Sequence, residues 1–188
     1  MVPHRRRTQY QSKFLTQEKN MIRTVSRMVG LLFVASVTSA LLDEPRYSEN
    51  MQLLKRLVKY RAAAKAYLQY GRMLRPLVFE GAMPLVEFRM KESTLARHDA
   101  VARQTAVMSS VWEGVDGSLA VVLFNISGME QVFKARLSAN MYPILNECSE
   151  LYSLMADGSE LLCGRVESGA LILEGKLGRD EVRILVAR

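Results

Sequence analysis

The chain has 188 residues, room for one domain or two small ones, and its 49% hydrophobic and 24% charged residues exclude a wholly disordered protein. The net charge of +7 is unevenly spread, since residues 1–76 carry 15 Lys and Arg against 4 Asp and Glu, whereas residues 77–188 carry 11 against 15. The basic half contains no recognisable nucleic-acid-binding motif, so we expect no nucleic-acid partner.

The N-terminal segment contains a basic stretch followed by an apolar one. Met28–Leu42 is a run of fifteen uncharged, mostly apolar residues, shorter than the roughly 20 that a membrane-spanning helix needs, so we expect no transmembrane span. Seven Lys and Arg residues precede it and Thr38-Ser39-Ala40 resembles a cleavage site, as in a secretory signal peptide. The leader of 27 residues is long for a signal peptide, and its apolar residues recur at helical spacing. Two interpretations stay open. We favour a buried core element and a cytoplasmic location, while a signal h-region at Met28–Ala40 would make the protein secreted.

A helix is predicted between Pro45 and Gly71. Proline favours the first turn of a helix, glycine commonly follows the last turn, and Pro76 closes the segment. The apolar residues in between share one helical stripe, and most lysines and arginines lie off it. The stripe consists of Leu53, Leu54, Leu57, Val58, Ala64 and Leu68. We expect the helix to dock by this stripe and to expose a solvated basic face.

After Pro76 the pattern changes to short apolar runs separated by turn residues. Glycine-containing turns lie between the runs, and strands repeated about every ten residues are typical of a sandwich or barrel. The predicted strands are Leu77–Glu80, Leu85–Met90, Ala106–Glu113, Ser118–Ile126, Gln131–Ser138, Leu161–Glu167, Ala170–Leu177 and Glu181–Ala187. The predicted fold class is α+β, with N-terminal helices in residues 1–76 followed by a C-terminal antiparallel β-sandwich in residues 77–188.

Alternation within the later strands predicts which side chains face the core. The inward set is Phe133, Ala135, Leu137, Leu171, Leu173, Leu177, Val182, Ile184 and Val186. The outward set is Lys134, Arg136, Glu174, Lys176 and Arg183. The run from Leu119 to Phe124 is apolar on both faces, which is typical of a central strand.

No complete catalytic site is recognisable. The sequence contains no nucleophile elbow, phosphate-binding glycine loop or dinucleotide fingerprint, so we predict no catalytic residue and no cofactor. Glu113 and Asp116 flank a turn and would be the carboxylate pair that glycoside hydrolysis needs, although acidic residues are routine at hairpin ends. No Cys and His cluster surrounds Cys148 and Cys163, so we predict no metal site and favour two buried free thiols over a disulfide.

Aromatic side chains offer binding as an alternative to catalysis. The flat faces of Trp112, Tyr142 and Tyr152 would suit the apolar faces of sugar rings, which makes these three the candidate carbohydrate-binding residues, although the strand position of Trp112 favours a core role. Asn125-Ile126-Ser127 matches the N-glycosylation acceptor pattern, which only a eukaryotic secreted protein would use. The sequence does not indicate an oligomeric state.

Two stretches resemble a known family. The predicted helix ends in Tyr-Gly-x-x-Leu-Arg-Pro at residues 70–76, and Ser110–Glu113 is followed by an Asp-Gly turn and an apolar strand that ends at Asn-x-Ser, in Asp116–Ser127. These stretches resemble the exit from the (β/α)₈ barrel into the C-terminal β-sandwich in a large uncharacterised family of bacterial glycoside-hydrolase-like proteins with an α-galactosidase-like barrel. The resemblance covers about Met28 to Arg188 and implies that Met28–Leu42 belongs to the last barrel strand region. The family's catalytic carboxylates come from earlier barrel strands, so the resemblance assigns no catalytic residue here.

Two functional hypotheses follow. The first is a C-terminal fragment of a carbohydrate-active, glycoside-hydrolase-like protein, whose β-sandwich is a structural or auxiliary module without a complete active site. The second is a secreted or anchored β-sandwich that binds carbohydrate or a protein partner. The mature N-terminus and the nucleotide sequence upstream of Met1 would distinguish the two.

Overall fold

The computed structural model describes residues 48–90 and 100–188. The predictions for residues 1–47, including the apolar run Met28–Leu42, lie outside the described residues. The helical elements are α3 (Ser48–Ala63), α4 (Lys65–Leu68) and the 3₁₀ helix η3 (Pro143–Asn146). The strands are β1 (Arg72–Met73), β2 (Leu85–Met90), β3 (Ala100–Thr105), β4 (Val107–Glu113), β5 (Leu119–Asn125), β6 (Gln131–Ser138), β7 (Glu150–Leu154), β8 (Glu160–Arg165), β9 (Ala170–Leu177) and β10 (Val182–Ala187).

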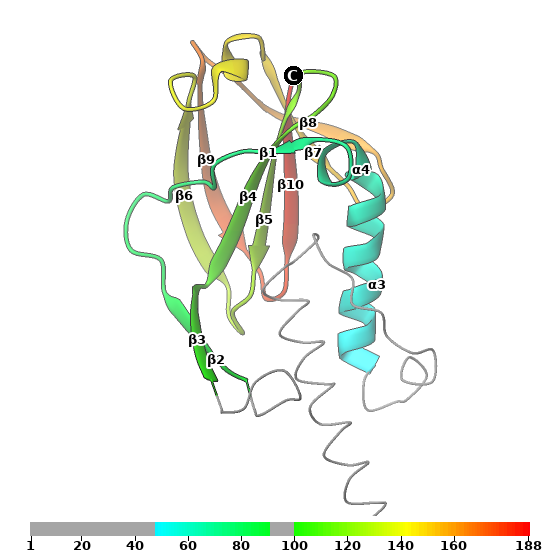
Figure 1. The fold of residues 1–188 in the computed structure, drawn as a ribbon, viewed down its shortest axis with the longest axis vertical. Coiled ribbons are helices and arrows are strands. Elements are labelled where there is room, and N and C mark those ends of the chain that lie inside the picture. The colour runs from blue at the N-terminus through cyan, green and yellow to red at the C-terminus, as the bar shows by residue number, and fades with distance from the viewer. Residues whose placement is uncertain (1–47, 91–99) are drawn as a thin grey trace, which may run out of the picture.

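Six strands form one antiparallel sheet in the order β1-β4-β5-β10-β7-β8 (Figure 1). Strand β5 lies inside this sheet, paired with β4 on one side and β10 on the other. All seven residues of β5 are buried, because both faces of the sheet are covered. The prediction of a central strand in this segment is confirmed. Two further pairs, β6–β9 and β2–β3, form separate two-stranded sheets.

One face of the six-stranded sheet packs against the β6–β9 pair, on the left of Figure 1. Val111, Val121 and Leu123 from the sheet share a core with Phe133 and Leu173 from the pair. Strict alternation makes this possible, since β6 buries every second residue along its length. Each large aliphatic side chain buried in this way stabilises the fold by roughly 1.5–3 kcal/mol.

The other face packs against the helices, on the right of Figure 1. Leu57 of α3 and Tyr67 of α4 share a second core with Trp112, Val122 and Ile184 of the sheet. Leu53, Leu57, Ala64 and Leu68 of the predicted apolar stripe therefore dock on the sheet, whereas Val58 is 42% exposed.

Glycine at position 71 allows the helix to meet the sheet closely. The helix ends as predicted near this residue, whose amide donates to the Tyr67 carbonyl oxygen at 2.9 Å. A Cβ atom added here would lie 2.5 Å from the carbonyl oxygens of Tyr67 and Glu113. Any larger residue would push α4 away from β4, so glycine lets the chain pass directly from the helix into β1.

The structure confirms an antiparallel, mostly β arrangement after the helices, and it corrects some strand predictions. Strands β2, β6 and β9 have the predicted bounds. The predicted strand Leu77–Glu80 is wrong, because only Phe79 makes an isolated bridge, with Ala135 of β6. Strands β1, β3 and β7 were not predicted, since the first is very short and the other two mix polar with apolar residues. A sandwich of two full sheets stays a prediction, because the described second layer is a single strand pair.

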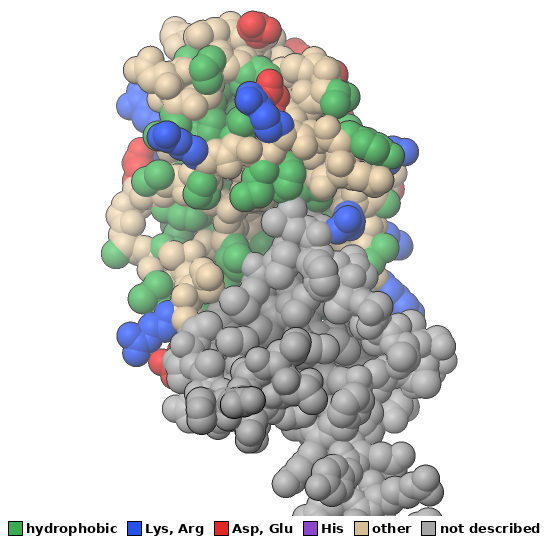
Figure 2. Space-filling model, in the orientation of Figure 1, with side chains coloured by type: hydrophobic (Ala, Val, Ile, Leu, Met, Phe, Trp, Pro, Cys, Tyr) green, Lys and Arg blue, Asp and Glu red, His purple; other side chains and the backbone are tan. Residues whose placement is uncertain are grey.

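The face assignments are confirmed. All nine residues of the inward set are buried. The outward set is exposed, except that Arg183 is half-buried and bonded to Glu181 and to the Lys176 carbonyl. Lys and Arg side chains are spread singly over the face shown in Figure 2 rather than gathered in one patch.

Candidate functional site

A polar cluster lies on the helix side of the sheet, near the C-terminal end of the chain. It consists of Tyr152 and Glu150 on β7, Glu160 on β8 and Arg188 after β10, and we call it the Tyr152 cluster. The register explains why these residues meet. Val186 pairs with Tyr152, and the Arg188 amide donates to the Glu150 carbonyl at 3.0 Å.

Each polar group in the Tyr152 cluster has a partner. The Tyr152 hydroxyl donates to the Glu150 carboxylate. The Arg188 guanidinium donates to Glu160 Oε1 at 2.6 Å, and its carbon lies 5.9 Å from the centre of the Tyr152 ring. The ring is half-buried, and the side chain of Arg188 is 46% exposed. The cluster therefore presents an aromatic ring, two carboxylates and a guanidinium at the surface.

Hydrogen bonds raise the pKa of two members of the Tyr152 cluster, Tyr152 and Arg188. The pKa of Tyr152 is raised, chiefly by its hydrogen bond to the Glu150 carboxylate, because loss of the phenol proton would place two negative charges together. A hydrogen bond with Tyr67 is the main cause of a raised pKa at Arg188, and the nearby Glu160 charge adds to it. At neutral pH the phenol is neutral and the guanidinium charged, an arrangement suited to hydrogen bonding with hydroxyl groups.

The other two predicted aromatic residues lie elsewhere. Trp112 is 8% exposed beneath the helices, and its indole nitrogen donates to Ser110 Oγ at 2.9 Å. Tyr142 is 2% exposed in the core on the opposite face of the sheet, and its hydroxyl donates to the Arg75 and Pro76 carbonyl oxygens. The structure does not bring the three rings together, so Tyr152 is the one of the three with an accessible edge.

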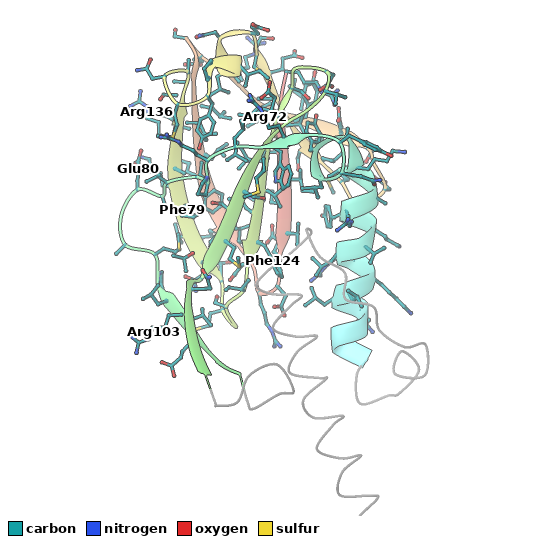
Figure 3. The ribbon with its side chains drawn as sticks, viewed as in Figure 1. Arg72, Phe79, Glu80, Arg103, Phe124 and Arg136 are labelled. Carbon is teal, nitrogen blue, oxygen red and sulfur yellow. The ribbon has the colours of Figure 1, made fainter. Side chains whose placement is uncertain are left out.

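Both carboxylates of the predicted pair, Glu113 and Asp116, already bond to neighbouring side chains. Glu113 accepts a hydrogen bond from Arg72 Nε at 3.0 Å, in an exposed ion pair between β4 and β1 (Arg72 is labelled in Figure 3). Asp116 accepts from the amide and hydroxyl of Ser118 at 3.2 and 2.5 Å. The Ser118 hydroxyl is also the main cause of a lowered pKa at Asp116. Because the pKa of Asp116 is lowered and Glu113 is bonded to Arg72, neither carboxyl is arranged as a general acid.

The Asn125 side chain joins two turns inside the fold. Its amide nitrogen donates to the carbonyl oxygens of Met129, Leu177 and Gly178 at 2.8–2.9 Å. Its Oδ1 accepts from the amide and hydroxyl of Ser127 at 2.9 and 2.7 Å. The residue is fully buried, so the glycosylation pattern noted in the sequence is here a structural motif and is inaccessible in the folded chain.

Both cysteines are free thiols in the structure. Cys148 is buried as predicted, and its Sγ lies 3.3 Å from the Ile144 carbonyl oxygen. The prediction of burial is wrong for Cys163, which is exposed on β8, because this strand lies at the edge of the sheet with little above it. Burial raises the pKa of both thiols.

Within residues 48–90 and 100–188 no three His, Cys, Asp or Glu side chains gather as metal ligands would. In the same part of the chain, no helix has the length and apolar character to cross a membrane.

Sequence reasoning missed three members of the Tyr152 cluster. Glu150 lies on the unpredicted strand β7, and Glu160 precedes the predicted start of β8. Arg188 is the last residue, and only the pairing of β10 with β7 brings it to the ring. Leu151 and Ser153 alternate with Tyr152 and Leu154 along this segment, but the alternation is too short to predict a strand.

No protein-family model and no curated protein matches the chain. Solved structures that resemble it in part include glycoside hydrolases and α-galactosidase-like proteins. One is a GH27 β-L-arabinopyranosidase from Geobacillus stearothermophilus, 16% identical over 45% of this chain, with a TM-score of 0.30. A provisionally assigned α-N-acetylgalactosaminidase from Bacillus halodurans is 12% identical over 91% of this chain, with a TM-score of 0.38. A provisionally assigned α-galactosidase from Bacteroides fragilis is 22% identical over 46%, with a TM-score of 0.30.

These alignments cover 17%, 30% and 17% of the three larger proteins. At such TM-scores and identities they establish neither a shared family nor a shared activity.

Proposed function

We propose that this chain contributes a non-catalytic, sandwich-like C-terminal β-domain of a glycoside-hydrolase-like protein. On this proposal residues 77–188 form the domain, and the segment up to residue 76 is the end of a (β/α)₈ barrel. The function of the β-domain is to support that barrel and to contribute an auxiliary contact with carbohydrate.

The observation that carries the proposal is the shared core between the helices and the sheet. Leu57 and Tyr67 pack on Trp112 and Val122, and the Tyr67 hydroxyl is bonded to Ser118 Oγ at 2.7 Å in a buried position. On this proposal, a helix held this firmly would attach the end of the barrel to the β-domain. This is what a support domain must do for a barrel whose last helix leads into it.

The carboxylates argue against chemistry within the β-domain. Glycoside hydrolysis needs two carboxyl groups separated by about 5–9.5 Å across a sugar, one of them protonated. Glu113 is paired with Arg72 and the pKa of Asp116 is lowered, so this pair does not provide the acid. In the Tyr152 cluster both carboxylates already accept hydrogen bonds from Tyr152 and Arg188.

The Tyr152 cluster supports the auxiliary contact. Sugar recognition combines an aromatic face with hydrogen-bonding groups that fix the ring hydroxyls. A half-buried phenol flanked by two carboxylates and a guanidinium provides that combination.

Two measurements test whether the chain is a non-catalytic domain attached to a barrel. The DNA upstream of Met1 is expected to encode βα repeats of a barrel, in frame or frameshifted, and an unrelated gene with its own promoter there would contradict it. The purified full chain is expected to release no chromophore from a panel of aryl α- and β-glycosides. Robust turnover that follows the chain through purification would show that it is an enzyme.

A glycan-binding measurement distinguishes the auxiliary contact with carbohydrate from the support of the barrel, because only the contact requires binding. Retention on affinity gels that carry plant and bacterial polysaccharides is expected to fall with Tyr152→Ala and to persist with Tyr70→Ala, which removes an aromatic ring that is 62% exposed outside the cluster. Equal retention of both variants would show that Tyr152 does not contribute to glycan binding. Sugar binding by a chain with no upstream barrel would favour an independent binding module instead.

A further inference from the structure

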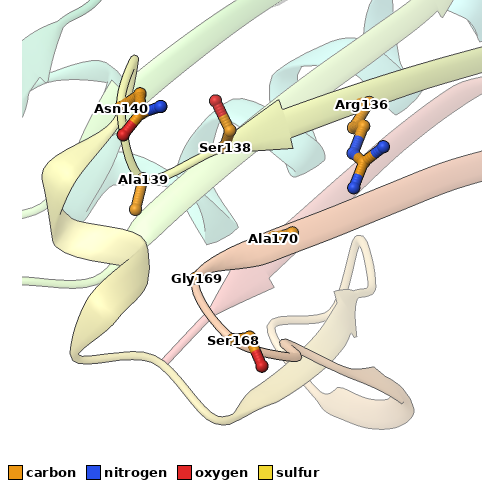
Figure 4. Close-up of a pocket in the computed structure, with 7 residues that line it drawn as sticks. All are labelled: Arg136, Ser138, Ala139, Asn140, Ser168, Gly169 and Ala170. Carbon is orange, nitrogen blue, oxygen red and sulfur yellow. The ribbon is translucent and has the colours of Figure 1, made fainter.

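A hollow of about 380 Å³ opens at one end of the β6–β9 pair (Figure 4). It lies on the side of the six-stranded sheet opposite the helices and the Tyr152 cluster, because the β6–β9 pair covers that other face. Its polar lining comes from Arg136 and Ser138 on β6, Asn140 after it, and Ser168 in the turn before β9. The volume falls within the range of small-molecule sites, roughly 300–1,000 Å³.

The turn that shapes this hollow has a fixed conformation. Ser168 and Gly169 both have left-handed φ angles, 50° and 67°, and Glu167 and Ala170 exchange two backbone hydrogen bonds around them, of 3.0 and 2.9 Å. A Cβ atom on residue 169 would lie 2.6 Å from Asn146 Oδ1. Glycine therefore lets the turn approach the loop beside it, and the hollow is formed before any ligand arrives.

Arg136 differs from the other cations on the outer face of this strand pair. Lys134 lies 3.5 Å from the Glu80 carboxylate and Lys176 lies 3.1 Å from that of Glu130. Arg136 forms no ion pair or hydrogen bond with any residue in the described part of the chain. Its cross-strand neighbour is Ile172, whereas Glu174 lies opposite Lys134. In Figure 4 the guanidinium extends from β6 toward the neighbouring strand β9.

The other polar side chains of the hollow are also available. Ser138, Asn140 and Ser168 make no side-chain hydrogen bond to the described residues. One guanidinium, two hydroxyls and one amide thus line this hollow, together with the methyl group of Ala170.

We propose that this hollow is a binding site for a sugar ring that carries a carboxylate, a uronic acid unit. The planar guanidinium of Arg136 matches a carboxylate with two parallel hydrogen bonds. Serine hydroxyls and the Asn140 amide both donate and accept, as ring hydroxyls require. Ala170 supplies a small apolar floor for the ring carbons. The site shares no residue with the Tyr152 cluster, so evidence for or against this site does not decide whether the proposed auxiliary contact exists.

The test titrates methyl β-D-glucuronide into the ¹⁵N-labelled full chain and follows backbone amide signals by NMR. The signals of Ser168, Gly169 and Ala170 are expected to shift in a saturable way. Methyl β-D-glucoside, which lacks the carboxylate, is expected to bind at least about tenfold more weakly. Sodium sulfate tests whether the hollow takes any oxyanion.

Variants locate the interaction. Arg136→Gln is expected to weaken glucuronide binding by about tenfold or more, and Arg136→Lys to restore part of it. Ala170→Leu, which fills the hollow without changing charge, is expected to weaken it as well. Lys59→Gln removes one exposed charge from α3 on the far face and is the matched control, expected to bind within about twofold of the parent chain. Tyr152→Ala is expected to leave this binding unchanged.

Three outcomes would overturn the proposal. They are unshifted Ser168 and Gly169 signals at saturating glucuronide, sulfate binding as tight as that of glucuronide, or Arg136→Gln binding equal to that of Lys59→Gln. Loss of glucuronide binding in Tyr152→Ala would place the sugar at the other cluster. All variants change exposed or half-exposed positions, and unchanged thermal melting confirms that they remain folded.

Discussion

Removing the side-chain amide of Asn125 should destabilise the protein strongly although no ligand is involved. This fully buried residue donates to three backbone carbonyls and accepts two hydrogen bonds. In Asn125→Ala the Leu177 carbonyl loses its side-chain donor in a buried position. Buried polar groups left unpaired cost about 1–3 kcal/mol each. With two amide hydrogens lost, we expect a loss of about 2–4 kcal/mol.

The measurement is urea unfolding followed by circular dichroism, with thermal melting as a second readout. The expected loss corresponds to a decrease in Tm of roughly 5–15 °C for a domain of this size. Asn140→Ala is the matched control, because that side chain is exposed and makes no hydrogen bond to the described residues. We expect it to change stability by less than about 0.5 kcal/mol.

Asn125→Asp sharpens the experiment, because it keeps the shape and the acceptor for Ser127 but places a carboxyl group against carbonyl oxygens. The folded state should raise the pKa of that carboxyl. The loss of stability caused by its ionisation is therefore small below the unfolded pKa of about 4 and grows as pH rises through the folded pKa. An Asn125→Ala variant as stable as Asn140→Ala would refute the reasoning. A cost of Asn125→Asp that does not change between pH 4 and pH 7 would do the same.

Three further predictions follow from the packing. Phe124→Asp places a charge in the helix-side core, where the ring is 2% exposed, and should prevent folding or lower Tm by well over 10 °C; a Tm within 3 °C of the parent would contradict this. Gly71→Ala should cost about 2 kcal/mol or more in urea unfolding, because its Cβ would overlap carbonyl oxygens of α4 and β4, whereas Gly128→Ala, with open space around it, should be nearly neutral. Iodoacetamide should label Cys163 much faster than Cys148, and faster as pH rises because burial raises the pKa of both thiols; equal rates, measured by peptide mass spectrometry, would show that Cys148 is accessible.

The sequence determined the local elements well where their signal is strong. Strict alternation in β6 and β9 gave both their bounds and their buried faces, because a period of two is a property of each strand alone. The uninterrupted apolar run in β5 indicated a strand covered on both sides. Glycine and proline placed the helix end near Gly71, since their backbone limits are also local.

Only the tertiary structure decided which side chains meet. Tyr152 and Glu160 lie on β7 and β8 and Arg188 follows β10, and no single stretch of sequence encodes how these strands pair. Trp112 and Tyr142 have similar aromatic character, yet the fold buries them on opposite faces of one sheet. The pairing of β6 with β9 sets Arg136 beside the turn at Ser168. The reason is physical: side-chain propensities act over a few residues, whereas strand order and burial depend on the free energy of the whole fold.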